Sequence, residues 1–140
     1  MSLNRFVGQV AVITGAASGI GQACALRFAR EGANVACLDF NATANQATAA
    51  ECRETGAEVS AHTCDVTDAG SLKAAIAAIM AQWGRVDILV AAAGIYSGSP
   101  LPEVSLKQWQ RLIDDALAGE RGKNFLGRRE ALLDAPAAAD

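Results

Sequence analysis

The amino-acid sequence is poor in the side chains that build metal centres and many catalytic sites. It contains one histidine, His62, and one tyrosine, Tyr96, in 140 residues. Its four cysteines show no C-x-x-C spacing, which disfavours both a zinc site and a disulfide framework. We therefore expect no metal site, an ordinary strand histidine, and reduced, buried thiols that behave as small hydrophobic residues. The cysteines are Cys24, Cys37, Cys52 and Cys64.

The chain also lacks a large excess of charge and any long apolar run. The net charge is -3 and the basic residues are scattered, so the sequence offers no footprint for nucleic acid or for an anionic membrane. No apolar run reaches the roughly 18 residues of a transmembrane helix. The opening stretch, MSLNRFVGQV, lacks the basic and apolar blocks of a secretory signal. We expect a cytoplasmic protein that binds neither nucleic acid nor membrane.

What the sequence does contain is enough apolar material for a single core. Hydrophobic residues make up 51% of the chain and charged residues 19%, as in globular proteins rather than disordered ones. From Gly119 onward the sequence becomes charge-dense and ends in the low-complexity stretch APAAAD. We expect one domain over residues 1–118, followed by a divergent and mobile tail over residues 119–140.

Short apolar segments alternate with helix-like segments before this tail. The alternation predicts a doubly wound, parallel α/β sheet of Rossmann type, because parallel strands need crossover connections. We expect the strand order 3-2-1-4. Strands are expected at residues 10–14, 33–39, 58–66 and 86–94, and helices at residues 20–30, 43–55, 68–83 and 105–117.

Two of the expected helices carry start and stop signals. Either Thr67 or Asp68 is suited to cap the third helix, and Gly84 is suited to end it. Ser105 and Gln108 have the spacing of a capping box at the start of the fourth helix.

The connection between the first strand and the first helix is rich in glycine. Residues 14–21 read TGAASGIG, with glycines at Gly15, Gly19 and Gly21. Glycines permit a tight turn, let the backbone approach a pyrophosphate and let the helix pack close to the strand. The helix N-terminus then offers unpaired N–H groups and a partial positive charge to an anion. The turn predicts a nucleotide-phosphate site, and a plain strand-to-helix connection is the alternative.

Two acidic residues end the second and third strands, at the edge of the sheet where ligands of such folds bind. Asp39 is placed to accept hydrogen bonds from both hydroxyls of an adenosine ribose. This favours NAD over NADP, because Asp39 would repel a 2′-phosphate and neither Phe40 nor Asn41 supplies a cation. Asp65 could accept from an adenine amino group while the backbone at Val66 contacts the ring. Helix capping is the alternative for both aspartates.

The glycine turn, the two aspartates and the end of the fourth strand form one ordered set of motifs. The set comprises Gly15-x-x-x-Gly19-x-Gly21, Asp39, Asp65-Val66, Ala93-Gly94-Ile95 and the segment PLPEVSLKQWQRLID. From about Phe6 to Asp114 the chain resembles the short-chain dehydrogenase/reductase family. The resemblance implies that the sheet is truncated before the later strands of the family. The fourth strand would then be an exposed apolar edge, through which the chain could form homo-oligomers or associate with other proteins.

The resemblance also implies that the turn holds the pyrophosphate of NAD(H) and that the backbone after the fourth strand lines the nicotinamide-side ribose. The cofactor-binding residues so implied are Gly15, Ser18, Gly19, Ile20, Gly21, Asp39, Phe40, Asp65, Val66, Ala92, Ala93 and Gly94.

Other positions depart from the family pattern. Ala91 and Ala92 replace asparagines that usually precede Ala-Gly, and Ala116 replaces the asparagine of the family's catalytic group. The family's reaction also needs a Tyr-x-x-x-Lys pair, whose lysine lowers the pKa of the tyrosine that acts as general acid and base. The 140 residues contain no such pair, since Tyr96 is followed four residues later by Pro100. We therefore assign no catalytic residue to this chain.

These observations favour an NAD(H)-binding oxidoreductase of short-chain dehydrogenase type that lacks turnover as the chain stands. One alternative is a non-catalytic nucleotide-binding or regulatory module that associates with a full-length relative. A methyltransferase that uses S-adenosylmethionine ranks last, because the acidic residue that usually precedes its tight G-x-G turn is absent.

Overall fold

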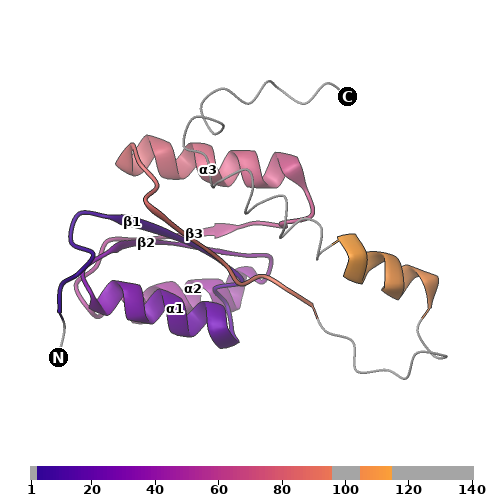
Figure 1. Ribbon diagram of the computed structural model, residues 1–140, viewed down its shortest axis with the longest axis horizontal. Helices are drawn as coiled ribbons and strands as arrows, with labels where there is room; N and C mark the ends of the chain where they lie inside the picture. Colours follow the sequence, from indigo (N-terminus) through magenta and orange to yellow (C-terminus); the bar gives the residue numbers. More distant parts are fainter. Residues whose placement is uncertain (1–2, 96–104, 115–140) are drawn as a thin grey trace.

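A computed structural model describes residues 3–95 and 105–114 of the chain. Strands and helices alternate in it, as the sequence predicts (Figure 1). A further helical segment covers residues 106–114. The strands and helices in chain order are β1 (Val10–Thr14), α1 (Gly19–Arg30), β2 (Asn34–Asp39), α2 (Ala42–Arg53), β3 (Val59–Thr63), α3 (Ala69–Trp83) and β4 (Ile88–Ala91).

The four strands form one parallel sheet in the order β3-β2-β1-β4, which confirms the predicted topology. Helices α1 and α2 cover one face of the sheet and α3 covers the other (Figure 1). From β1 to β3 the chain adds each new strand on the same side of the sheet. After β3 it crosses to the other side of β1, where it forms β4. In doubly wound folds, ligands bind beside the strand at which the order reverses, which here is β1.

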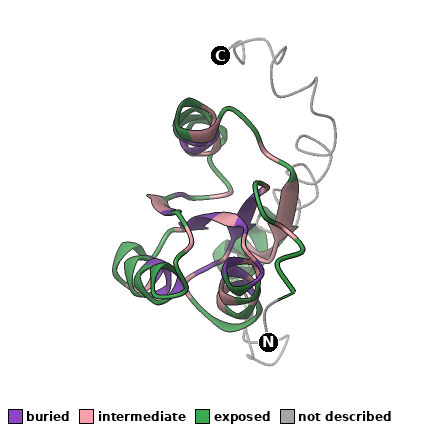
Figure 2. Ribbon diagram, turned by 90° about the vertical axis from the view of Figure 1, so that its left-hand side faces the viewer, coloured by how far each residue is buried: buried purple, intermediate pink, exposed green. Residues whose placement is uncertain are grey.

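The core lies on both faces of the central strand β1. Ala11 and Ile13 pack into the cluster under α1 and α2, whereas Val10 and Val12 pack into the cluster under α3. This alternation is the period-two pattern of a strand. All five residues of β1 are buried, as expected for a parallel strand covered on both faces (Figure 2). The buried β1 holds the glycine turn that follows it in a fixed place.

The helix boundaries follow the local signals in the sequence. Asp68 caps α3, and its carboxylate accepts hydrogen bonds from the backbone N–H groups of Gly70 and Ser71. Gly84 ends α3 in the left-handed conformation with φ +68°. The capping box before residues 106–114 is also present, since Gln108 N–H donates to Ser105 Oγ and Ser105 N–H donates to Gln108 Oε1.

Strands β3 and β4 are shorter than the sequence predicts. β4 ends at Ala91 because its partner β1 ends at Thr14, the residue opposite. In the same way β3 ends at Thr63, opposite the last residue of β2, Asp39. The strand lengths are set by pairing with β1 and β2, and the residues after each strand are left to form loops.

Strand β4 lies at one edge of the described sheet and its four residues are half-buried. Within residues 3–95 and 105–114, no helix is long and apolar enough to cross a membrane. The tail at 119–140, together with Tyr96, Pro100 and Ala116, lies outside the described residues.

Candidate functional site

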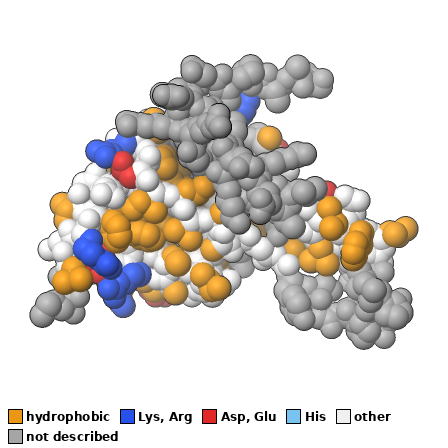
Figure 3. Space-filling model, in the orientation of Figure 1, with side chains coloured by type: hydrophobic (Ala, Val, Ile, Leu, Met, Phe, Trp, Pro, Cys, Tyr) orange, Lys and Arg blue, Asp and Glu red, His pale blue; other side chains and the backbone are white. Residues whose placement is uncertain are grey.

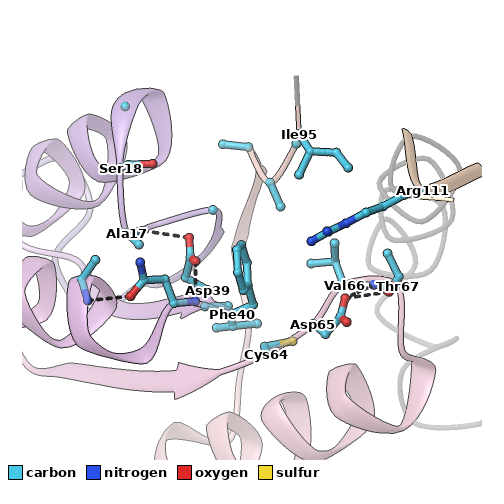
Figure 4. Close-up of a pocket in the computed structure, with 18 of the residues that line it drawn as sticks. Ala17, Ser18, Asp39, Phe40, Cys64, Asp65, Val66, Thr67, Ile95 and Arg111 are labelled. Atoms are coloured by element: carbon cyan, nitrogen blue, oxygen red, sulfur yellow. Dashed lines mark hydrogen bonds between the residues drawn. The ribbon is translucent and has the colours of Figure 1, made fainter. Parts of the chain in front are cut away.

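The loops that follow the four strands surround a cleft of about 850 Å³ at the carboxyl edge of the sheet (Figure 4). A cleft of this volume is within the range of pockets that bind small molecules and cofactors. Of the residues that the sequence predicts for the site, Gly21 alone does not line it. Those that do are Gly15, Ser18, Gly19, Ile20, Asp39, Phe40, Asp65, Val66, Ala92, Ala93 and Gly94.

Gly15 forms the floor of the cleft between β1 and β4. Its φ is +68°, and a Cβ placed there would lie 2.7 Å from Ala93 N and 2.8 Å from the carbonyl of Ala92. The backbone after β4 therefore packs directly on the glycine turn, and Ala93 N–H donates to Thr14 Oγ1 at 3.2 Å. This contact needs a residue without a side chain at position 15, both for its backbone conformation and for space.

Gly21 has a different role from the other two glycines of the turn. It is buried in the first turn of α1, where a Cβ would clash with the carbonyl oxygen of Gly15. Gly21 thus lets α1 pack closely against the turn and stays away from the cleft. Gly19, with φ +55° and open space around it, faces the cleft instead.

The N-terminus of α1 points its first residues at the cleft. Ser18 is the N-cap residue, yet its side chain makes no capping hydrogen bond. The first turn of a helix has N–H groups without intrahelical partners, and here no acidic side chain occupies that turn. The end of α1 therefore presents donors and a partial positive charge to whatever lies beside Ser18, Gly19 and Ile20.

The carboxylate of Asp39, at the end of β2, is hydrogen-bonded to the glycine turn. Its Oδ2 accepts from Ala17 N–H at 3.1 Å and its Oδ1 accepts from Asn41 N–H at 2.9 Å (Figure 4). The capping of α2 is done by Asn41, whose side chain accepts from Ala44 N–H. Asp39 is thus held beside the turn, and each carboxylate oxygen retains a lone pair for a further hydrogen bond.

Two large apolar side chains stand exposed at the cleft. Ile20 is 78% exposed and Phe40 is 66% exposed, although both line the cavity. Apolar surface left open in a concave site is typical of a surface that a ligand covers.

Asp65 lies across the cleft from the glycine turn. Its Oδ1 accepts from both the hydroxyl of Thr67, at 2.7 Å, and the backbone N–H of Thr67, at 2.9 Å. These two hydrogen bonds, together with the nearby charge of Arg111, lower the pKa of Asp65 below its usual value. Asp65 is therefore ionised at neutral pH, and capping of α3 is done by Asp68 rather than by Asp65.

Sequence reasoning missed several lining residues, most of all those of the helical segment 106–114. Lys107, Gln110, Arg111 and Asp114 line the cleft, and their spacing places them on one helix face. The polar stripe was visible in the sequence, but an amphipathic helix is ordinarily expected to turn its polar face to solvent. The remaining lining residues are Ala17, Leu38, Asn41, Ala44, Cys64, Thr67 and Ile95.

The histidine and the cysteines lie apart from any metal-binding arrangement. Across residues 3–95 and 105–114, no group of three or more His, Cys, Asp or Glu side chains is placed to hold a metal ion. His62 is a residue of β3, as expected, and burial lowers its pKa. Cys37, Cys52 and Cys64 are buried as predicted, whereas Cys24 is partly exposed.

Comparisons with known proteins agree with this geometry. Residues 9–120 match the sequence profile of the short chain dehydrogenases. The D-threitol dehydrogenase of Mycolicibacterium smegmatis is 44% identical to this chain over 118 residues, which cover 82% of this chain and 44% of that protein. The sorbitol dehydrogenase of Cereibacter sphaeroides is 40% identical over 115 residues, with the same two shares. The chain thus spans about half the length of the curated relatives it matches.

Solved structures give the same result. The carveol dehydrogenase of Mycobacterium avium, in complex with NAD, superposes with a TM-score of 0.71 at 30% identity, over 84% of this chain and 50% of that one. A metagenomic short-chain oxidoreductase in complex with NADP gives a TM-score of 0.79 at 31% identity, over 93% of this chain and 59% of that one. From its fold, its glycine turn and these matches, the chain belongs to the short-chain dehydrogenase/reductase family.

Proposed function

We propose that this chain binds NAD(H) in the cleft at the carboxyl edge of its sheet. In a protein of this family that carries the catalytic residues, the dinucleotide would serve hydride transfer between its nicotinamide and an alcohol or carbonyl substrate. The observation that carries the proposal is the meeting of the helix N-terminus at Ser18 with the carboxylate of Asp39 in one cavity. The first suits a pyrophosphate and the second suits a ribose diol, and the two groups belong to one dinucleotide.

The preference for NAD over NADP rests on Asp39. Relatives with either cofactor are known, so family membership alone leaves the choice open. A 2′-phosphate placed on the ribose would meet the Asp39 carboxylate, and two unit charges 4 Å apart repel by about 1 kcal/mol in water and about 4 kcal/mol at an effective dielectric of 20. Arg111, one of the two cations that line the cleft, acts on Asp65, whereas the hydrogen bonds to Asp39 come from the backbone N–H groups of Ala17 and Asn41. We expect NADP to bind about tenfold more weakly than NAD, or worse.

We further propose that the 140-residue chain has no dehydrogenase turnover on its own. Proton transfer in this family's reaction needs a Tyr-x-x-x-Lys pair, and the sequence has none. Ala116, which stands where the family has an asparagine, has no side chain that can relay a proton.

A second candidate function is that of a nucleotide-binding module that associates with a full-length relative. The half-buried strand β4 at the edge of the described sheet favours it, because an edge strand has unpaired N–H and C=O groups that can bind another chain. Mixing the chain with a purified relative and measuring a change in the relative's activity would distinguish this role from an isolated cofactor site.

Calorimetric titration with NAD, NADP and S-adenosylmethionine tests the cofactor proposal. We expect binding of NAD, weaker binding of NADP and no binding of S-adenosylmethionine. Asp39→Asn keeps the shape of the side chain and one acceptor but removes the charge, so the preference for NAD over NADP should shrink. Unchanged selectivity in Asp39→Asn would exclude Asp39 from cofactor choice, and hydride transfer to any of a set of carbonyl compounds would refute the absence of turnover.

A further inference from the structure

The helical segment 106–114 turns its polar face, rather than its apolar face, toward the cleft. Its apolar residues Leu106, Trp109 and Ile113 are 88%, 51% and 38% exposed, and hydrophobic side chains gather over this helix at the right of Figure 3. The opposite stripe, at positions 107, 110, 111 and 114, lines the cavity. Charged side chains of this helix therefore line the same cleft as the glycine turn and the loops after the strands.

The side chain of Arg111 extends into the cavity in the close-up view. It extends from the helix between Ile95 and Val66 and points toward Phe40 across the open space (Figure 4). The guanidinium also acts electrostatically on Asp65. Arg111 therefore faces the end of the cleft that lies between the loops after β2 and β3.

The charges at this end decide what Arg111 can bind. Two cations, Lys107 and Arg111, and three carboxylates, Asp39, Asp65 and Asp114, line the cleft, so its positive charge is balanced. A phosphate placed beside Arg111 would also meet Asp65, which the nearby hydrogen bonds keep ionised. An anionic group is thus disfavoured here, whereas an uncharged, planar ring is not.

The shape and the chemistry of the same groups favour a ring. A guanidinium is planar and stacks on aromatic faces. Phe40, 66% exposed on the other side of the space, offers a second flat apolar surface. Both hydrogen bonds that the described residues give to Asp65 end on Oδ1, so Oδ2 is left to accept from a ring amino group.

We propose that Arg111 stacks on the purine ring of the bound nucleotide and so forms the wall of the base site opposite Phe40. This inference rests on the proposed function, because it names the part of that ligand which the helical segment 106–114 would hold.

Binding of adenosine 5′-monophosphate, NAD and nicotinamide mononucleotide to the full chain tests the proposal. Arg111→Leu should weaken the two adenine ligands by about 5- to 30-fold, in line with a stacked cation–π contact, and leave nicotinamide mononucleotide unchanged. Arg111→Lys keeps the charge but loses the planar group. Its affinity for the two adenine ligands should therefore fall nearly as far as that of Arg111→Leu. Lys73→Leu removes a positive charge from an exposed position of α3 that does not line the cleft, and should stay within about twofold of the unmodified chain.

Nicotinamide mononucleotide separates the ring contact from a general effect on the fold. A variant with a disturbed fold would lose affinity for this ligand as well, whereas loss of the stacking contact weakens only the ligands that carry adenine. Full affinity for the adenine ligands in Arg111→Leu or Arg111→Lys would overturn the inference, as would an equal loss for nicotinamide mononucleotide. If the unmodified chain bound neither NAD nor adenosine 5′-monophosphate, the proposed function itself would fail, and the inference with it.

Discussion

Gly15→Ala is the most direct test of how the cleft is built. Gly15 has φ +68°, and the new Cβ would lie 2.7 Å from Ala93 N and 2.8 Å from the carbonyl of Ala92. The left-handed conformation costs a residue with a side chain about 1–2 kcal/mol, and displacing packed backbone costs about 1–3 kcal/mol more. We expect a total loss of about 2–5 kcal/mol, which is large beside the roughly 5–15 kcal/mol that stabilises a typical domain.

The chain offers a matched control for the backbone part of this loss. Gly84 has the same φ of +68°, but a Cβ there would meet nothing within 4 Å. Gly84→Ala should therefore lose only the conformational part, about 1–2 kcal/mol. The difference in free energy of unfolding between the two variants gives the steric cost of placing the new Cβ at position 15 against the backbone after β4.

Equilibrium unfolding in urea, followed by circular dichroism, measures both variants. If the free energy of unfolding falls with urea concentration at the same slope in both variants, their folded and unfolded states expose similar surface. The two free energies of unfolding can then be subtracted. We expect Gly15→Ala to be less stable than Gly84→Ala by about 1–3 kcal/mol. Equal losses in the two variants would refute the close packing of Ala92 and Ala93 on Gly15, and with it the geometry of the cleft floor.

Three further predictions concern stability and reactivity. Arg5 donates to the buried Glu31 carboxylate and lowers the pKa of Glu31 below its usual value. The stability that the ionised Glu31 contributes is complete above its pKa in the unfolded chain and is lost as pH falls through its pKa in the folded chain. Urea midpoints should therefore show Glu31→Gln less stable than the unmodified chain at pH 7, with the gap closing in acid, and a constant gap would contradict this. Asp68→Ala removes the cap of α3 and should cost about 1 kcal/mol in the same assay, whereas no change would mean that the cap contributes nothing. A thiol reagent should label Cys24 first in the native chain, since the other cysteines are buried; uniform labelling would refute that burial.

Much of the fold could be predicted because its signals are local. Parallel topology follows from alternating strands and helices, and the order β3-β2-β1-β4 was predicted and is confirmed. Asp68 and Gly84 mark the ends of α3 through their own side chain and backbone chemistry. The end of β4 was placed too late, because the apolar run continues to Ala93 while pairing with β1 stops at Ala91.

Sequence alone determined which residues come to the cleft from the strand ends. The carboxyl ends of parallel strands share one edge of a sheet, so Gly15, Asp39 and Asp65 had to converge there once the strands were identified. Their roles as cofactor ligands remain predictions.

Only the tertiary structure decided how those residues are held and what faces them. That Gly21 packs under the carbonyl of Gly15, and that Asp39 accepts from Ala17 N–H, depends on how α1 and β2 pack around the turn. The approach of Arg111 depends on where its helix lies relative to loops far away in the sequence. Periodicity and capping signals report on neighbours within a few residues, whereas these contacts arise from packing between distant segments, so no local pattern encodes them.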